Sequence, residues 1–307
     1  MSPSLQEHIN SGKYLEIDGI KYFYRDSSSK EEIVVLLHGF LTTSYHYRKV
    51  ISILEKKYRV IAPDFLGVGL SERPTTPLSH RMQAYYLYKF LEKVTEEKKV
   101  HVVAHDYALP ILAFLLKEHP EHIKSLTISN GFLNLPKFRF YLPLSLLRIP
   151  LFGDVFSFLF RPPFIKWIYQ LFLTKKGFVF ENNWANDTYT LLFSGKNRKN
   201  TLEFIRNVDR STHTLRDVED GVKSLVGLRQ IIIGEEDYRI SPYQTEFIKE
   251  TLRTSALSFV PSNHLPMEEC PEELANKIEF LVDSYSRNSK KTKTFQFKRT
   301  KPNGEES

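Results

Sequence analysis

Short apolar runs alternate with longer stretches of helical periodicity along most of the chain. The run at 33–37, IVVLL, contains no polar position and ends abruptly at His38, as a strand buried on both faces would. Similar runs follow at 59–62, 100–104, 125–129 and 230–233, with a shorter one at 257–260. The helical stretches lie at 47–56, 82–94, 109–118 and 243–251. Buried strands separated by helices predict an α/β fold with a mostly parallel central sheet flanked by helices.

The beginning of the chain carries a different signal. Two short β-like runs, 14–17 and 20–24, flank the dipeptide Asp18-Gly19, which favours a tight hairpin turn. We therefore expect an antiparallel hairpin before the first buried strand.

The alternation of strands and helices stops between residues 132 and 216, after the sixth predicted strand. This segment of about 85 residues is crowded with aromatic, leucine and proline residues. Charges at Arg148, Asp154 and Arg161 interrupt its most apolar part, so no charge-free run approaches the roughly 18 residues of a membrane-spanning helix. We interpret the segment as a helical lid whose apolar face covers a pocket; a face that lies on lipid is the alternative. The predicted organisation is a core in two parts, 1–131 and 217–284, with the lid at 132–216 and a basic tail at 285–307.

Composition and charge narrow the class of protein. The 307 residues are 41% hydrophobic, enough for a large core, so disorder is excluded for most of the chain. Residues 284–307 hold seven Lys or Arg and two Glu, so +5 of the net charge of +7 belongs to the tail and +2 to the rest. The body therefore gives no sign of nucleic-acid binding. We expect the tail to be solvated and disordered, with an anchor for anionic lipid as the alternative.

The cysteine count and the first residues bear on the compartment. A single cysteine, Cys270, excludes a disulfide framework, a zinc ribbon and a CxxC redox pair, and it favours a reducing environment. The opening MSPSLQEHINSGKY lacks the apolar run of a signal peptide. We expect a cytoplasmic protein, with peripheral membrane contact through the lid or the tail as the alternative.

Chemically active side chains follow the ends of several predicted strands. They are His38, Gly39 and Phe40 after 33–37; His105, Asp106 and Tyr107 after 100–104; Glu235, Glu236 and Asp237 after 230–233; and His264 beyond 257–260. Ligands of open parallel sheets bind beyond the carboxyl ends of the strands, so we expect these residues to converge on one site.

Asp106 stands between a buried strand and an apolar helix, where a carboxylate is costly unless donors surround it. The first amides of the following helix can supply such donors. Small residues at Ala104 and Ala108 leave room for a tight turn. We predict that Asp106 is an anion presented on a sharp turn; an aspartate that merely caps the helix is the alternative.

The order Asp106, Asp237, His264 is the chain order of nucleophile, acid and base in α/β-hydrolases. From about residue 15 to 284 the sequence resembles an α/β-hydrolase. Within that superfamily it is similar to the branch with an aspartate nucleophile, which holds epoxide hydrolases and haloalkane dehalogenases. The motifs that carry the resemblance are HGF at 38–40, PDFLGVGLSERP at 63–74 and NHLPMEECPEE at 263–273.

The resemblance implies a two-step hydrolysis without a metal or an organic cofactor. The ionised Asp106 displaces a leaving group from a saturated carbon and becomes an ester. His264, oriented by Asp237, then activates the water that hydrolyses the ester. The backbone amides of Phe40 and Tyr107 form the oxyanion hole.

The neighbouring polar residues take supporting roles in this interpretation. Asp237 fits the G-x-x-D pattern of the family, so we prefer it over Glu235 and Glu236 as the acid. We expect His38, next to Gly39, to brace the oxyanion loop by hydrogen bonding rather than to transfer protons.

The leaving group separates the two subfamilies. Dehalogenases of this branch hold the halide with a Trp after the nucleophile and often an Asn after the HG pair, positions at which this sequence has Tyr107 and Phe40. Epoxide hydrolases polarise the ring oxygen with two lid tyrosines, for which the candidates are Tyr141, Tyr169 and Tyr189; lid packing is the alternative role of each.

The expected activity is therefore epoxide-hydrolase-like, on a small apolar organic substrate. Dehalogenation is the alternative, with Trp184 as a candidate halide donor. A weakly active protein of this fold that binds a membrane or a partner is a third interpretation.

Overall fold

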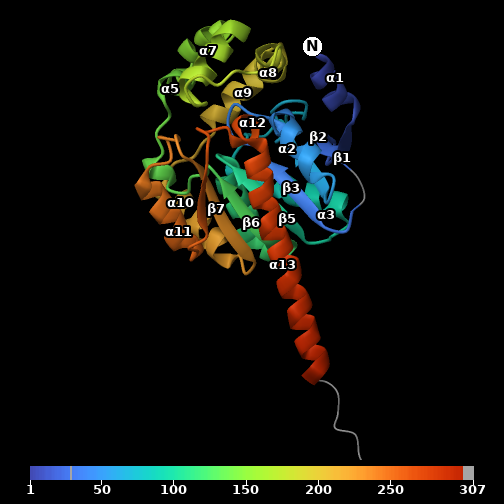
Figure 1. Ribbon diagram of the computed structural model, residues 1–307. Helices are drawn as coiled ribbons and strands as arrows, with labels where there is room; N and C mark the ends of the chain where they lie inside the picture. The colour runs from blue at the N-terminus through green and yellow to red at the C-terminus, as the bar shows by residue number, and fades with distance from the viewer. Residues whose placement is uncertain (28–29, 300–307) are drawn as a thin grey trace, which may run out of the picture.

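An eight-stranded sheet forms the centre of the computed structural model, which describes residues 1–27 and 30–299 (Figure 1). Its strand order is β1-β2-β4-β3-β5-β6-β7-β8. The strands are β1 (Gly12–Ile17), β2 (Ile20–Asp26), β3 (Ile33–Leu37), β4 (Arg59–Pro63), β5 (Val100–His105), β6 (Ile123–Ser129), β7 (Leu228–Gly234) and β8 (Leu257–Val260). From β4 to β8 all neighbours in the sheet pair in parallel, whereas β1 and β2 form the predicted antiparallel hairpin. The α/β fold predicted from the sequence is confirmed.

The strands at the middle of the sheet are the most apolar. Every residue of β3 and of β5 is buried, which explains their lack of polar alternation. Helices cover them: α2 packs against α13, which lies across β6 and β7, and α4 packs on β5 between α3 and α10. These core helices are α2 (Arg48–Leu54), α3 (His80–Thr95), α4 (Ala108–Glu118), α10 (Thr212–Ser224), α11 (Pro242–Leu252), α12 (Pro266–Glu269) and α13 (Pro271–Arg299).

The insertion after β6 is helical and lies over one end of the sheet, at the top of Figure 1. Its helices are α5 (Leu142–Leu147), α6 (Phe152–Phe156), α7 (Pro162–Phe172), α8 (Trp184–Leu192) and α9 (Lys196–Arg206), with short 3-10 turns η3 (Leu135–Lys137) and η4 (Ser157–Leu159). The boundary expected at residue 216 cuts through α10. Because α10 begins at Thr212 and packs against α4, we place the whole helix with the core.

A short helix that the sequence analysis did not predict opens the chain. It is α1 (Pro3–Asn10), capped by the hydroxyl of Ser2. The amide and hydroxyl of Ser2 both donate to the buried carboxylate of Asp187 in α8. This contact between residues far apart in sequence fixes α1 beside the lid.

The C-terminal helix corrects the expectation of a disordered tail from residue 285. The helix α13 continues through Arg299 and projects from the body at the end opposite the lid (Figure 1). Its first half docks on the core through Leu274, Ile278 and Val282. No Gly or Pro follows before residue 300, and an established helix extends readily through Lys and Arg. Residues 300–307 of the expected tail lie outside the described residues.

Among the helices of the described ranges, none combines the length and the apolar character needed to cross a membrane.

Candidate active site

Asp106 occupies a sharp turn between β5 and α4. Its φ of +50° lies in the left-handed region, which is strained for a residue with a side chain. Its amide donates to the carbonyl of Ser129 at the end of the neighbouring strand β6 (3.2 Å). The geometry is that of the strand–turn–helix elbow expected for a nucleophile.

The Asp106 carboxylate is buried but well provided with partners. The amide of Phe40 donates to Oδ2 (2.9 Å), and Nε2 of His264 lies 3.5 Å from Oδ1. Burial raises the pKa of Asp106, but the hydrogen bond and charge of His264, with contributions from His105 and the Phe40 amide, outweigh it, so the pKa lies below its ordinary value. Asp106 is therefore an anion at neutral pH.

His264 links Asp106 to a second carboxylate. Its Nδ1 donates to Oδ2 of Asp237 (2.7 Å), which leaves Nε2 directed at Asp106. Its backbone is also fixed, because its amide donates to the carbonyl of Leu173 in the lid and its carbonyl accepts from His105 Nε2. Burial and the charge of Arg239 lower the pKa of His264, but Asp237 and Asp106 outweigh them and raise it. The structure thus brings Asp106, His264 and Asp237 together in one chain of contacts.

Two residues that the sequence analysis missed hold Asp237. Asn130 donates to Oδ2 (2.7 Å), and Arg239 donates to Oδ1 through its backbone amide and its guanidinium. Burial raises the pKa of Asp237, but His264 and Arg239 outweigh it and hold the pKa far below the usual range. Asn130 directly follows β6, so the rule applied to the other strand ends could have found it. No comparable signal marks Arg239.

The loop after β3 faces Asp106. A methyl group on Gly39 would stand 2.5 Å from Asp106 Cβ, so only glycine allows this approach. The imidazole of His38 bonds the carbonyl of Gly39 through Nδ1 (3.0 Å) and accepts from the amide of Phe65 through Nε2 (3.0 Å). Burial lowers the pKa of His38, which keeps it neutral in this bracing position.

The backbone amides of Phe40 and Tyr107, the two expected oxyanion donors, differ in their contacts with Asp106. The Phe40 amide already bonds Asp106, whereas within the described residues no hydrogen bond joins the Tyr107 amide to that carboxylate. The side chains of both residues are buried and stack, with ring centroids 4.0 Å apart. The ring of Tyr107 therefore packs behind Phe40, which itself lines the cavity at Asp106.

The structure separates the four lid candidates. Tyr141 lies at the small cavity that also contacts Asp106 and His264. The hydroxyl of Tyr169 donates instead to the carbonyl of Leu41, and that of Tyr189 accepts from Arg161. The indole of Trp184 donates to the buried Glu268 (2.9 Å). Of the four side chains, the one that lines the same cavity as Asp106 is Tyr141.

The cavity above Asp106 is nearly closed. Its volume is about 20 Å³, room for roughly one water molecule, so a larger substrate needs the lid to move. Apolar residues and two arginines line it: Phe40, Phe138, Tyr141, Leu173, Ile240, Arg139 and Arg239, with Asp106 and His264.

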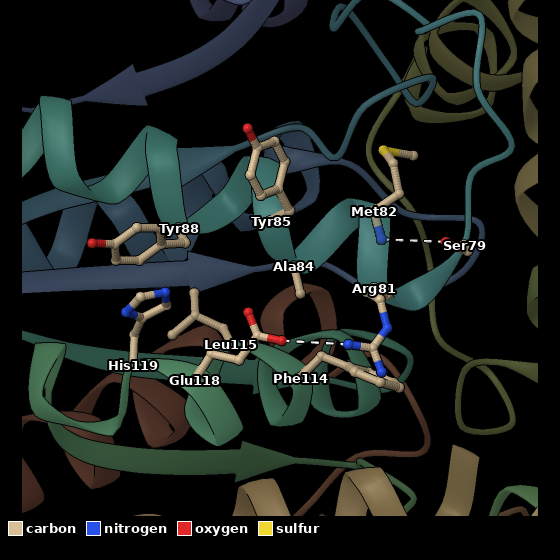
Figure 2. A pocket seen from close by; sticks show the side chains of 10 residues that line it. All are labelled: Ser79, Arg81, Met82, Ala84, Tyr85, Tyr88, Phe114, Leu115, Glu118 and His119. Carbon is tan, nitrogen blue, oxygen red and sulfur yellow. Dashed lines mark hydrogen bonds and ion pairs between the residues drawn. The ribbon is translucent and has the colours of Figure 1, made fainter. Parts of the chain in front are cut away.

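A larger cavity, about 400 Å³, lies between α3 and α4 (Figure 2). Arg81 and Glu118 pair across it (3.4 Å), and the ring of Tyr88 stacks on His119. None of its lining residues belongs to the group around Asp106. We therefore do not assign it to catalysis.

Three residues next to this cavity could hold a metal ion. His119, Glu121 and His122, at the turn η2 (Pro120–His122), each place one ligand atom within 4.8 Å of the others. They follow α4, whereas Asp106 precedes it, and this helix of 11 residues is about 16 Å long. The group has no part in the chemistry at Asp106.

Comparison with known proteins agrees with this geometry. A family model described as alpha/beta hydrolase fold matches residues 32–269. The mesoderm-specific transcript protein of Mus musculus is 34% identical over 146 residues, which cover 43% of this chain and 43% of that relative. The match thus spans less than half the length of this relative. A cis-3-alkyl-4-alkyloxetan-2-one decarboxylase of Shewanella oneidensis is 25% identical over 297 residues, 88% of this chain and 87% of the relative.

Solved structures share the same architecture. The haloalkane dehalogenase DbeA from Bradyrhizobium elkani superposes with a TM-score of 0.78 at 18% identity, over 91% of this chain and 99% of its own. At this identity the likeness concerns the fold. In sequence, haloalkane dehalogenase 1 of Mycobacterium tuberculosis is 37% identical over 117 residues, 36% of this chain and 37% of that enzyme.

Proposed function

The chain belongs to the α/β-hydrolase fold family. We propose that it is a hydrolase in which Asp106 is the nucleophile, His264 the general base and Asp237 the acid that orients the base. The main support for this proposal comes from the surroundings of Asp106. It sits at φ +50° on the β5–α4 turn, with the Phe40 amide at 2.9 Å and the His264 imidazole at 3.5 Å.

In the first step, a carboxylate oxygen of Asp106 attacks a saturated electrophilic carbon. The bond from that carbon to its leaving group breaks, and the enzyme carries an ester. The lowered pKa of Asp106 supports this role, because the nucleophile needs no base to remove a proton. Closing the cavity around the anion excludes competing water.

In the second step, His264 takes a proton from a water molecule through Nε2, and the resulting hydroxide attacks Cγ of Asp106. The Phe40 amide is positioned to donate to the oxyanion. The charge of Asp237 stabilises the imidazolium, which then protonates the departing alcohol oxygen. Loss of the alcohol leaves Asp106 as a carboxylic acid, which then loses its proton to solvent and becomes a carboxylate again.

The leaving group is best accounted for by a strained oxygen ring. Tyr141 faces the same cavity as Asp106, and its phenol can donate a proton to the alkoxide formed when an epoxide opens. The phenolate then regains a proton from solvent before the next turnover. The aromatic and aliphatic lining favours an apolar substrate. We therefore propose an epoxide-hydrolase-like activity whose product is a vicinal diol.

Two other electrophiles fit the same attack. One relative, which matches 88% of the chain, is named for an oxetan-2-one, a strained cyclic ester. Arg139 and Arg239 at the cavity could stabilise the carboxylate leaving group of such a ring. Dehalogenation is supported by the named dehalogenase relatives. It is disfavoured because the indole N–H of Trp184 already donates to Glu268 and is not available to a halide.

Trapping the ester tests the proposal. The His264→Gln variant should form the ester and fail to hydrolyse it, so intact-protein mass spectrometry should show a stable adduct, mapped to Asp106 by peptide analysis. The same variant is exposed to an alkyl epoxide, an oxetan-2-one and a bromoalkane of matched chain length. An epoxide adds its whole mass, whereas a bromoalkane adds only its alkyl group.

The control is the double variant Asp106→Asn with His264→Gln, which should form no adduct. Absence of an adduct with all three electrophiles in folded His264→Gln protein would overturn the proposed nucleophile. An adduct with the bromoalkane alone would replace the epoxide assignment by dehalogenation.

A further inference from the structure

The lid carries an unusual concentration of exposed apolar side chains. Of the eighteen large hydrophobic residues exposed in the described part of the chain, ten lie within the 38 residues from 142 to 179. They are Leu142, Ile149, Leu151, Phe152, Val155, Phe158, Leu159, Trp167, Leu171 and Val179, which we call the lid face. Scattered exposed apolar residues are ordinary, but a set concentrated in one segment marks a surface that is covered in use.

The helix α7 shows why the lid face is not explained by packing. One side of α7 is buried through Ile165, Ile168 and Tyr169, as in any amphipathic helix. Trp167 and Leu171, four residues apart on the outer side, are exposed by 54% and 51%. A helix on an ordinary protein surface would carry polar residues there, whereas α7 exposes these two side chains as an apolar strip next to Lys166 and Gln170.

Basic residues accompany the lid face. Between residues 138 and 180 the chain has six Lys or Arg and one Asp, a net charge of +5. The exposed Arg161, Lys166 and Lys176 take part in no ion pair among the described residues. The single acid, Asp154, is paired with Arg206. Positive charge beside exposed Trp, Phe and Leu is complementary to a membrane surface that contains anionic lipids.

We infer that the lid face docks on the surface of a lipid bilayer with anionic headgroups. The helices α5, α6 and α7 are at most 11 residues long, too short to span a bilayer but suited to lying in its interface. Arg161, Lys166 and Lys176 contact the headgroups, while Trp167 and its apolar neighbours enter the boundary with the acyl chains.

If the lid face docks on a membrane, the end of the basic C-terminal helix α13 cannot touch the same membrane. The lid helices and the free end of α13 lie at opposite ends of the molecule (Figure 1). A flat membrane that touches α7 cannot also touch the end of α13. We therefore assign membrane binding to the lid face and not to the free end of α13.

Vesicle binding tests the inference with the full-length protein. We expect it to co-sediment with phosphatidylcholine vesicles containing about 30 mol% phosphatidylserine, and less with pure phosphatidylcholine or at high salt. The double variant Trp167→Ser with Leu171→Ser should weaken the partition about 10- to 100-fold. A second pair, Leu151→Ser with Phe152→Ser, tests the same face outside α7.

Matched controls remove exposed apolar area elsewhere. Val226→Ser and Phe280→Ser replace side chains exposed by 93% and 66% outside the lid, and they should bind vesicles as the unaltered protein does. Asp106→Asn should also bind normally, which separates this inference from the proposed chemistry. Tryptophan fluorescence measures insertion of Trp167 directly. Because the other tryptophan, Trp184, is buried, quenching of the emission by brominated lipid reports insertion of Trp167.

Three results of the vesicle experiments, and one of light scattering, would overturn the inference. The three vesicle results are absence of binding to both kinds of vesicle, binding unchanged in both lid-face pairs, and binding lost only when residues 284–307 are removed. If light scattering instead shows a dimer that dissociates in the lid-face variants, a second copy of the chain covers the face and the lipid assignment is wrong.

Discussion

Glu269 ties down the backbone on both sides of His264. Its Oε1 accepts hydrogen bonds from the amides of Asn263 (3.0 Å) and Leu265 (3.3 Å), and its Oε2 accepts from the amide of Lys175 in the lid (2.7 Å). Burial raises the pKa of Glu269 to about 7, because it outweighs the opposing effect of these three amides. One carboxylate therefore couples the segment that carries His264 to the lid.

Removal of this carboxylate should affect the second chemical step more than the first. In the proposed mechanism His264 acts as a base only on the ester, so Glu269→Ala should slow ester hydrolysis about tenfold while ester formation changes little. Rapid-quench kinetics that separate the two steps measure this. Glu269→Gln keeps one acceptor oxygen and should recover part of the rate. Equal slowing of both steps would indicate a general loss of structure instead.

The pH dependence of turnover should follow His264. The base must be neutral to accept a proton, and its pKa is raised above the ordinary 6.5. Ester hydrolysis should therefore fall as the pH drops through that raised pKa, while Asp106, with its lowered pKa, stays ionised. The charge of Arg239 lowers the pKa of His264, so Arg239→Gln should move the acidic limb to higher pH. Single-turnover rates between about pH 5 and 9 give the profile; an unmoved limb would contradict it.

Gly39→Ala should disable the site without unfolding the chain. The added methyl would meet Asp106 Cβ at 2.5 Å and Oδ2 at 2.7 Å, so the oxyanion loop or the elbow must shift. Overpacking of this kind costs about 1–3 kcal/mol of stability. Loss of the Phe40 amide from Asp106 should lower the rate of ester hydrolysis about 100-fold. Thermal unfolding and kcat are measured together, and full activity would show that the loop is free to move aside.

The sequence could predict the sheet and the elbow because both depend on local pattern. β3 and β5 are apolar runs that end at polar residues, a pattern typical of parallel strands that are buried on both faces. The chain order of Asp106, Asp237 and His264 then favoured the topology of an α/β-hydrolase.

The lid and the two ends of the chain depend on contacts that no local pattern reveals. Which tyrosine faces Asp106 is decided by how α5 and α7 sit on the core, so Tyr141 could not be separated from Tyr169. The helix α1 is mostly polar and is held by Asp187, 185 residues away from Ser2. Charged composition alone predicted a disordered tail, although α13 continues a docked helix through Arg299.

Tyr141→Phe distinguishes an acid role from a packing role. If the phenol protonates the leaving alkoxide, its removal should slow ester formation from an epoxide about 100-fold or more, and leave hydrolysis of the ester nearly unchanged. A bromide needs no proton, so alkylation by a bromoalkane should be insensitive to the change. Tyr189→Phe, whose hydroxyl contacts Arg161 away from the cavity, is the matched control and should behave as the unaltered enzyme. Because phenylalanine keeps the ring, lost packing cannot explain a selective effect on epoxides; equal rates in both variants would remove Tyr141 from the mechanism.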